Sequence, residues 1–83
     1  MTLILDGTLF GNANQIHNYL ANQLCLPPYY GRNLDALYDC LTERGGETTL
    51  VLQNWPDSGL TGPFLRVFLD AAESNPHLRI IPT

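Results

Sequence analysis

Apolar residues along the chain gather in three short runs, which are separated by amphipathic stretches. The runs contain TLIL, TTLVLQ and LRII, and turn-forming residues such as Asp6-Gly7 bound them. Runs of this length that are rich in Leu, Ile, Val and Thr are typical of buried strands. We therefore expect strands near residues 2–6, 48–53 and 78–82.

Between the runs, apolar residues recur at the spacing that places them on one face of a helix. The three sets are Ile16, Leu20 and Leu24; Leu34, Leu37 and Leu41; and Phe64, Val67, Phe68 and Ala71. Asn33 is a good N-cap for the second helix, Pro27 ends the first, and Gly45-Gly46 supply a stop after the second. We expect helices near residues 13–25, 34–44 and 64–74.

The order of these elements is strand, helix, helix, strand, helix, strand. Strands that alternate with helices favour an α/β fold, here a three-stranded, mostly parallel sheet packed against three main helices. The chain has 83 residues and no internal repeat, so we expect a single domain over residues 1–83.

The charge balance is acidic. Four arginines and no lysine face eight acids, which gives a net charge of −4. This composition argues against direct binding to nucleic acid, which needs a basic surface, and it suits either a basic partner or simple solubility. The start MTLILDG is not a signal peptide, and no stretch is long and apolar enough to span a membrane. We expect a cytoplasmic protein with no membrane partner.

No residue pattern points to catalysis or to a cofactor. Cys25 and Cys40 have no metal-ligand spacing, and we expect them to be free, mostly buried thiols. His17 falls within the first helix and His77 opens the last strand, so each is expected to be structural or exposed. The glycines do not form a phosphate-binding motif. We expect no catalytic residue, no metal and no cofactor.

Three carboxylates form a stripe along the expected second helix. Asp35, Asp39 and Glu43 stand at i, i+4 and i+8, and like charges at this spacing destabilise a helix by about 0.2–0.5 kcal/mol per pair. Asp35 is favoured by the helix dipole in the first turn. Asp39 has a like charge one turn away on both sides. Of the three acids, it is the one whose presence helix stability explains least.

The stripe can be a solvated acidic face or a binding surface, and the charges alone leave both possibilities open. Tyr29, Tyr30 and Tyr38 flank the acids, and tyrosine is enriched among interface anchors. The tyrosines favour a binding surface, although we expect one of them, Tyr30, to belong to the core.

The segment LPPYYGRNLDALYDCLT, residues 26–42, closely resembles the matching segment of the barstar family of intracellular ribonuclease inhibitors. LVLQNW, VFLDAA and RIIP resemble later parts of the same family more loosely. The resemblance implies a barstar-like fold and a protein that inhibits a toxic or secreted ribonuclease, without catalysis. The second helix and the loop before it would occlude the basic active site of the cognate ribonuclease.

The resemblance also implies roles for single residues. Asp39 would mimic a substrate phosphate, Asp35 would pair with a further basic or hydrogen-bonding group, and Tyr29 would pack near the catalytic histidine of the partner. Gly31 would keep the loop close to the partner, and Asp70 would make a peripheral contact. The remaining members of the expected partner-binding set are Asn33, Tyr38, Thr42 and Glu43.

The chain departs from the family pattern at four positions, one of which is Cys25, which has no counterpart in the family. Tyr38 replaces a tryptophan, Arg32 replaces an acid and Arg44 replaces an aromatic residue. Two arginines beside the acidic surface would weaken attraction to a strongly basic partner, which suggests a cognate ribonuclease with acids at its rim. Two other functions stay open. One is the same surface binding a basic partner that is not a nuclease, and the other is a small enzyme that uses Asp35 and Asp39, or Cys40.

Overall fold

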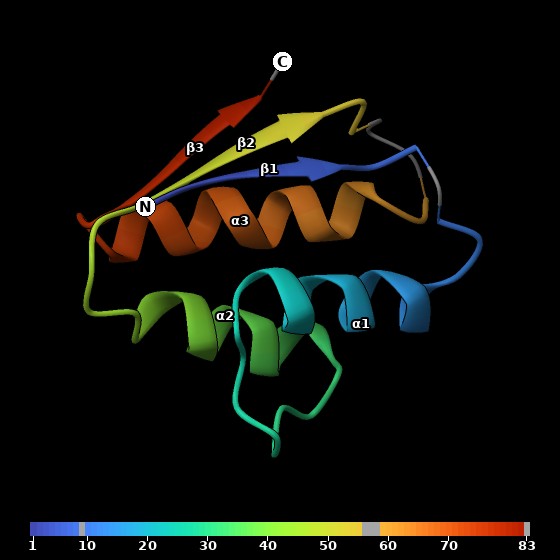
Figure 1. The fold of residues 1–83 in the computed structure, drawn as a ribbon, viewed down its shortest axis with the longest axis horizontal. Helices are drawn as coiled ribbons and strands as arrows, with labels where there is room; N and C mark the ends of the chain where they lie inside the picture. Colours follow the sequence, from blue (N-terminus) through green and yellow to red (C-terminus); the bar gives the residue numbers. More distant parts are fainter. Residues whose placement is uncertain (9, 56–58, 83) are drawn as a thin grey trace.

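The computed structural model describes residues 1–8, 10–55 and 59–82 of the chain (Figure 1). The elements follow the predicted order, and their bounds are β1 Thr2–Asp6, α1 Ala13–Gln23, α2 Leu34–Thr42, β2 Thr48–Gln53, α3 Gly62–Ser74 and β3 Leu78–Pro82. The predicted strands are confirmed at their bounds. The first two helices end two residues before the predicted ends, and α3 begins two residues earlier than expected because Pro63 suits its first turn.

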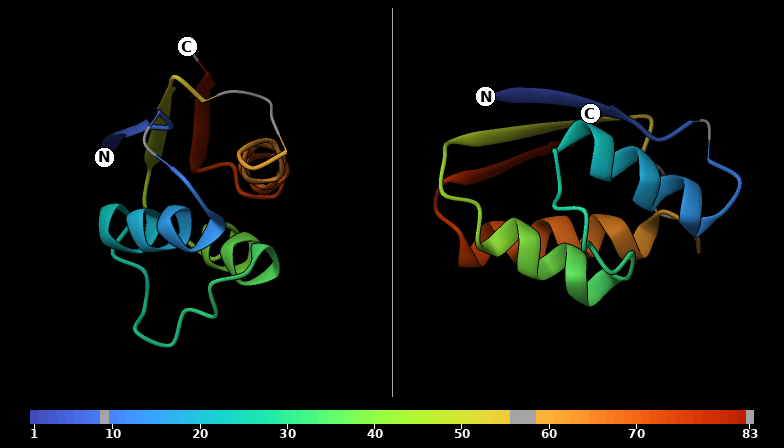
Figure 2. Two further views of the ribbon diagram at one scale, coloured as in Figure 1. Left: turned by 90° about the vertical axis from the view of Figure 1, so that its right-hand side faces the viewer. Right: turned by 60° about the horizontal axis from the view of Figure 1, so that its bottom comes forward.

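The three strands form one parallel sheet in the order β1-β2-β3. Leu3 lies beside Leu50, and Leu50 lies beside Ile80, so the register aligns apolar positions across the sheet. All three helices lie on the same side of the sheet (Figures 1 and 2). The predicted α/β class, with a parallel sheet and three main helices, is confirmed.

The core lies between the sheet and the helices. Its fully buried members come from every layer and include Leu5, Leu50 and Leu52 of the sheet, Ile16 and Leu20 of α1, Leu37 and Leu41 of α2, and Phe68 of α3. Leu34 was expected in the same stripe but is only half-buried, because it is the first residue of α2. In the described part of the chain, no helix has the length and apolar character that a membrane span requires.

Helix α2 lies beside α1 on the helical side of the sheet and packs along α3 (Figures 1 and 2). Its carboxyl end is held by Asn75, a buried residue just after α3. The Asn75 Nδ2 atom donates to the carbonyls of Leu41 at 2.9 Å and Arg44 at 3.0 Å. Its Oδ1 atom accepts from the backbone N–H of His77 at 3.0 Å. One side chain therefore joins the end of α2 to the turn before β3.

This contact replaces the expected glycine stop. Helix α2 ends at Thr42, before Gly45-Gly46, and neither glycine has a positive φ. A glycine C-cap needs that left-handed backbone. The end of α2 is thus fixed by a residue more than 30 positions away in the sequence, since Asn75 satisfies carbonyls that a helix end leaves without partners.

We expect Asn75→Ala to lower the free energy of unfolding by at least about 2 kcal/mol. The change removes three hydrogen bonds and leaves buried backbone groups unpaired, each of which costs about 1–3 kcal/mol. Chemical denaturation measures the effect. Asn22→Ala, at an exposed position of α1, is the matched control and should change stability by no more than about 0.5 kcal/mol. Equal midpoints for the two variants would show that Asn75 does not anchor α2.

Candidate functional site

A left-handed turn starts the loop that precedes α2. Leu24 caps α1 and stays in the core, and Cys25 then takes a φ of 52°. The Leu26 N–H donates to the Ala21 carbonyl at 3.0 Å, which closes the helix in a Schellman-type end. Cys25 is exposed, so the expectation that it is mostly buried was wrong. The left-handed turn directs its side chain away from the core position that Leu24 occupies.

A second left-handed residue ends the same loop. Arg32 has a φ of 52°, and its Nε atom donates to Oδ1 of Asn18 on α1 at 2.9 Å. Asn33 then caps α2, as predicted, because its Oδ1 atom accepts from the Ala36 N–H at 2.7 Å. The loop of residues 25–32 is therefore fixed at both ends, and the arginine at its far end is directed toward α1.

Gly31 lies where the loop approaches α2. A Cβ atom added at this residue would lie 3.1 Å from Nδ2 of Asn33 and 3.5 Å from Cβ of Ala36. The same Nδ2 atom donates to the Gly31 carbonyl at 3.3 Å. A side chain here would press on the residue that caps α2, which gives a structural reason for glycine.

The loop has a buried anchor and an exposed neighbour. Tyr30 is buried, as predicted, and its hydroxyl hydrogen-bonds to Nδ1 of His17. The His17 ring also packs against Phe64, with ring centroids 4.9 Å apart. Tyr29 is 85% exposed. Tyr29 lies in a turn that the Tyr30 N–H closes by donating to the Pro27 carbonyl at 2.9 Å, and its ring is at the surface of the loop.

The ionisation of the buried pair follows from its surroundings. Burial is the main cause that raises the pKa of Tyr30 to about 12, so the phenol keeps its proton at neutral pH. Burial also lowers the pKa of His17, and the charge of Arg32 lowers it further. A neutral His17 can accept the hydrogen bond from the Tyr30 hydroxyl at Nδ1. His17 is structural, as expected, and His77 is exposed.

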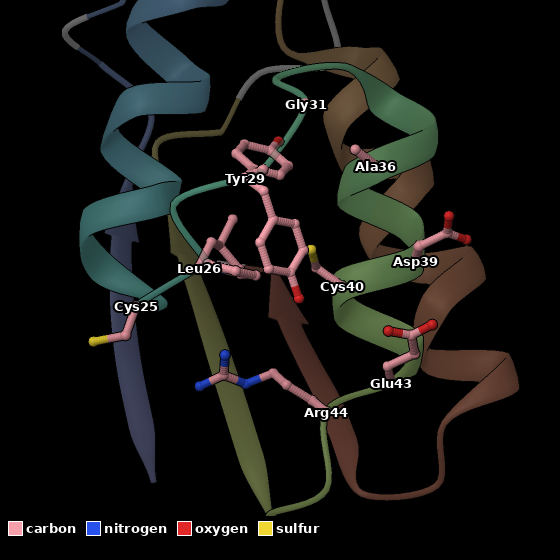
Figure 3. A pocket seen from close by; sticks show the side chains of 11 residues that line it. Cys25, Leu26, Tyr29, Gly31, Ala36, Asp39, Cys40, Glu43 and Arg44 are labelled. Carbon is pink, nitrogen blue, oxygen red and sulfur yellow. The ribbon is translucent and has the colours of Figure 1, made fainter.

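A cavity of about 410 Å³ lies between the loop and α2 (Figure 3). Four members of the predicted partner-binding set line it, namely Tyr29, Gly31, Asp39 and Glu43. The other five do not line it. They are Asn33, Asp35, Tyr38, Thr42 and Asp70. The structure therefore brings the loop residues and the second half of the acidic stripe into one concave surface.

The five remaining residues are either exposed or held by contacts within the chain. Asp35 on α2 and Asp70 on α3 are exposed. Tyr38 is half-buried, and its hydroxyl lies 2.9 Å from Oγ of Ser74, which ties α2 to α3. Thr42 is also half-buried, and its hydroxyl donates to the Asp39 carbonyl at 3.1 Å. Tyr38 and Thr42 thus already have structural contacts.

The sequence interpretation missed Arg44 as part of the cavity. Its Nη1 atom donates to the Leu24 carbonyl at 2.8 Å, and its Nε atom donates to Oγ1 of Thr48 at 3.3 Å. Arg44 therefore joins the ends of α1 and α2 to the start of β2. In the sequence, the only sign of this role was the position of Arg44 beside an acidic stripe. Its partner Leu24 lies 20 residues away in the sequence.

The thiol of Cys40 also faces the cavity. Cys40 is half-buried, as expected. Burial raises its pKa, the carboxylates of Glu43 and Asp39 raise it further, and Arg44 opposes them. A nucleophilic cysteine needs a lowered pKa, so this environment disfavours an enzyme that uses Cys40. In the described ranges, no three His, Cys, Asp or Glu side chains are placed to hold a metal ion.

Comparisons with known proteins agree with this architecture. The family model described as "Barstar (barnase inhibitor)" matches residues 1–79 of the chain. The chain is also 50% identical over 54 residues to a Bacillus subtilis (strain 168) protein named "Putative ribonuclease inhibitor YrdF". That match covers 64% of this chain and 59% of the relative, so the chain matches about three fifths of the relative's length.

We expect the free energy of unfolding to fall as the pH is lowered below about 6.5, because of His17. Its pKa in the folded chain is below the ordinary value of 6.5, so the unfolded chain binds the proton more tightly. The stabilisation is complete above about pH 6.5 and is lost as the pH falls through the folded pKa. Urea titrations between about pH 7.5 and pH 5 measure this slope, above the range in which most carboxylates titrate.

The matched control is His17→Gln, whose amide can accept the Tyr30 hydrogen bond but does not titrate. This variant should show a flatter dependence of stability on pH in the same range. An unchanged slope would mean that another group causes the pH dependence.

Proposed function

Because the chain belongs to the barstar family of ribonuclease inhibitors, we propose that it inhibits a toxic or secreted ribonuclease by occluding the active site with α2 and the preceding loop. The observation that carries the proposal is the concave surface between the loop and α2, which is lined by the exposed Tyr29 and by the acids Asp39 and Glu43. A ribonuclease active site binds a polyanion, so it presents positive charge of the opposite sign.

The carboxylates of this surface are available to a partner. Within the described ranges, the one close contact between a basic and an acidic side chain joins His77 and Glu47, with Nδ1 and Oε1 2.9 Å apart, and neither residue lines the cavity. The repulsion along the stripe of Asp35, Asp39 and Glu43 is therefore not relieved by an internal cation. Docking onto a basic active site would relieve it, and the field of the stripe would accelerate encounter.

The fixed loop lowers the entropic cost of binding. Hydrogen bonds from Arg32 and Asn33, together with the buried Tyr30, hold the loop before a partner arrives. A surface that is already ordered loses little conformational freedom on association. We therefore infer that the loop and α2 dock as one rigid unit.

Three acids have proposed roles in binding, two on α2 and one on α3. Asp39 takes the place of a substrate phosphate, Asp35 pairs with a further basic or hydrogen-bonding group, and Asp70 contacts the partner at the periphery. The inhibitor would act by steric and electrostatic occlusion in the cytoplasm of the cell that makes the ribonuclease. It would need no cofactor and no direct contact with RNA.

The test uses barnase, the ribonuclease named in the family description, as a defined probe. The chain should reduce cleavage of a fluorogenic RNA substrate by barnase in a concentration-dependent way. Tight binding without loss of cleavage would contradict occlusion of the active site. Binding to a basic protein that is not a nuclease, with none to barnase, would instead favour a module for another basic partner.

Asp39→Ala should weaken binding to barnase by about 2–5 kcal/mol, because a basic group of the partner is then buried without its counter-charge. Stability should change little or rise slightly, since two repulsions along α2 disappear and alanine is the better helix former. Inhibition assays and denaturant midpoints on the same variant measure both effects.

The matched control for this variant is Asp6→Asn, which also removes one negative charge. Asp6 accepts hydrogen bonds from the N–H and hydroxyl of Thr8 through Oδ1, and an asparagine retains that acceptor. The control should inhibit nearly as well as the parent. If Asp39→Ala inhibits normally but is clearly less stable, Asp39 is a structural residue and the proposed site is wrong.

Ionic strength should act mainly on association. Salt screens the field of the acidic stripe, so the on-rate for barnase should fall steeply as salt is raised, while the off-rate changes far less. Stopped-flow measurements over a salt series separate the two rates. An on-rate that is independent of salt would indicate a mainly apolar interface without electrostatic steering.

A further inference from the structure

Arg44 is held in place by neutral acceptors. Two of its N–H groups are used, by the Leu24 carbonyl at 2.8 Å and by Oγ1 of Thr48 at 3.3 Å. A guanidinium carries five N–H donors in a fixed planar arrangement. The side chain is therefore oriented by its contacts with the ends of α1 and β2, and it retains donors beyond the two that these contacts use.

The charge of Arg44 is not neutralised by the acids that share its cavity. Asp39, Glu43 and Arg44 all line the cavity, yet within the described ranges neither acid lies within 4.0 Å of the Arg44 guanidinium as a salt bridge would require. Figure 3 shows Arg44 at one end of the cavity, where it reaches toward the loop, while Asp39 and Glu43 extend from α2. The cavity thus presents a cation and two anions at separate places.

A partner that covers this cavity must accommodate both signs of charge. Burying a guanidinium without a counter-charge is strongly unfavourable, whereas a carboxylate that meets the oriented N–H groups forms charge-assisted hydrogen bonds. Building on the proposed function, we infer that Arg44 is a specificity-determining residue that binds a carboxylate of the partner ribonuclease, beside that enzyme's basic active site. Arg44 selects ribonucleases with an acid at this place and disfavours those with a base there.

Arg32 is a matched comparison for Arg44, because it is a second arginine near the acidic surface but does not line the cavity. Its Nε atom also bonds to α1, through Oδ1 of Asn18, but the residue is exposed and does not line the cavity. Removing Arg32 or Arg44 changes the net charge equally. Comparing variants of Arg32 and Arg44 therefore distinguishes a local contact in the cavity from a general effect of net charge.

The test is a glutamate scan of barnase, in which exposed neutral residues around the active-site rim are changed singly to glutamate. Each variant is measured against the parent chain, Arg44→Gln and Arg32→Gln. We expect at least one glutamate to tighten binding to the parent chain by about tenfold. That gain should vanish with Arg44→Gln and persist with Arg32→Gln. Arg44→Lys, which keeps the charge without the planar fork, should retain part of the gain.

Denaturation midpoints accompany the scan, because Arg44→Gln also alters the contact with α1. The amide nitrogen of glutamine lies where the arginine Nε lies, so it can still donate to Oγ1 of Thr48, and a folded variant is expected. If no glutamate tightens binding, or if the gain is equal with Arg44→Gln and Arg32→Gln, the role of Arg44 is wrong. Inhibition of parent barnase tests the proposed function separately. A gain that depends on Arg44 without any inhibition would overturn that function and leave the carboxylate contact standing.

Discussion

The buried contact between Tyr30 and His17 positions the surface on which the proposed function depends. His17 comes from α1, and Tyr30 comes from the loop that leads to α2. Their hydrogen bond therefore fixes the loop relative to α1. The neighbouring Tyr29 is exposed. If the phenol of Tyr30 left the core, Tyr29 and Gly31 would lose their fixed place beside α2, and the cavity would lose one wall.

A second constraint is the repulsion between like charges on α2, which lowers the stability of the helix. The stripe of Asp35, Asp39 and Glu43 destabilises α2 slightly through repulsion between like charges. Contacts elsewhere compensate, since Asn75 holds the end of α2 and Tyr38 joins its middle to α3. Helix α2 can therefore carry unfavourable charge, because its carboxyl end and one of its sides are anchored. This division between anchoring residues and charged residues is what a rigid surface for a basic partner requires.

Much of the fold could be predicted from the sequence, because strands and helices here follow the local hydrophobic pattern. The three strands, the cap at Asn33 and the buried Tyr30 were predicted correctly. The failures involve contacts between distant residues or backbone conformation. Asn75 and Arg44 bond to carbonyls far away in sequence, and nothing local marks Cys25 as left-handed. Cys25 and Arg44 line the cavity, so the sequence suggested the acids, the tyrosine and a nearby arginine, but neither the shape of the cavity nor the contacts that orient Arg44.

The central claim is that the loop of residues 25–32 and α2 together cover the active site of a ribonuclease. The most direct test is amide hydrogen exchange of the chain, measured by NMR with and without barnase. The account predicts new protection concentrated between residues 29 and 43, with β1 and β3 unchanged. Protection confined to the sheet, with none in the loop or α2, would contradict the account.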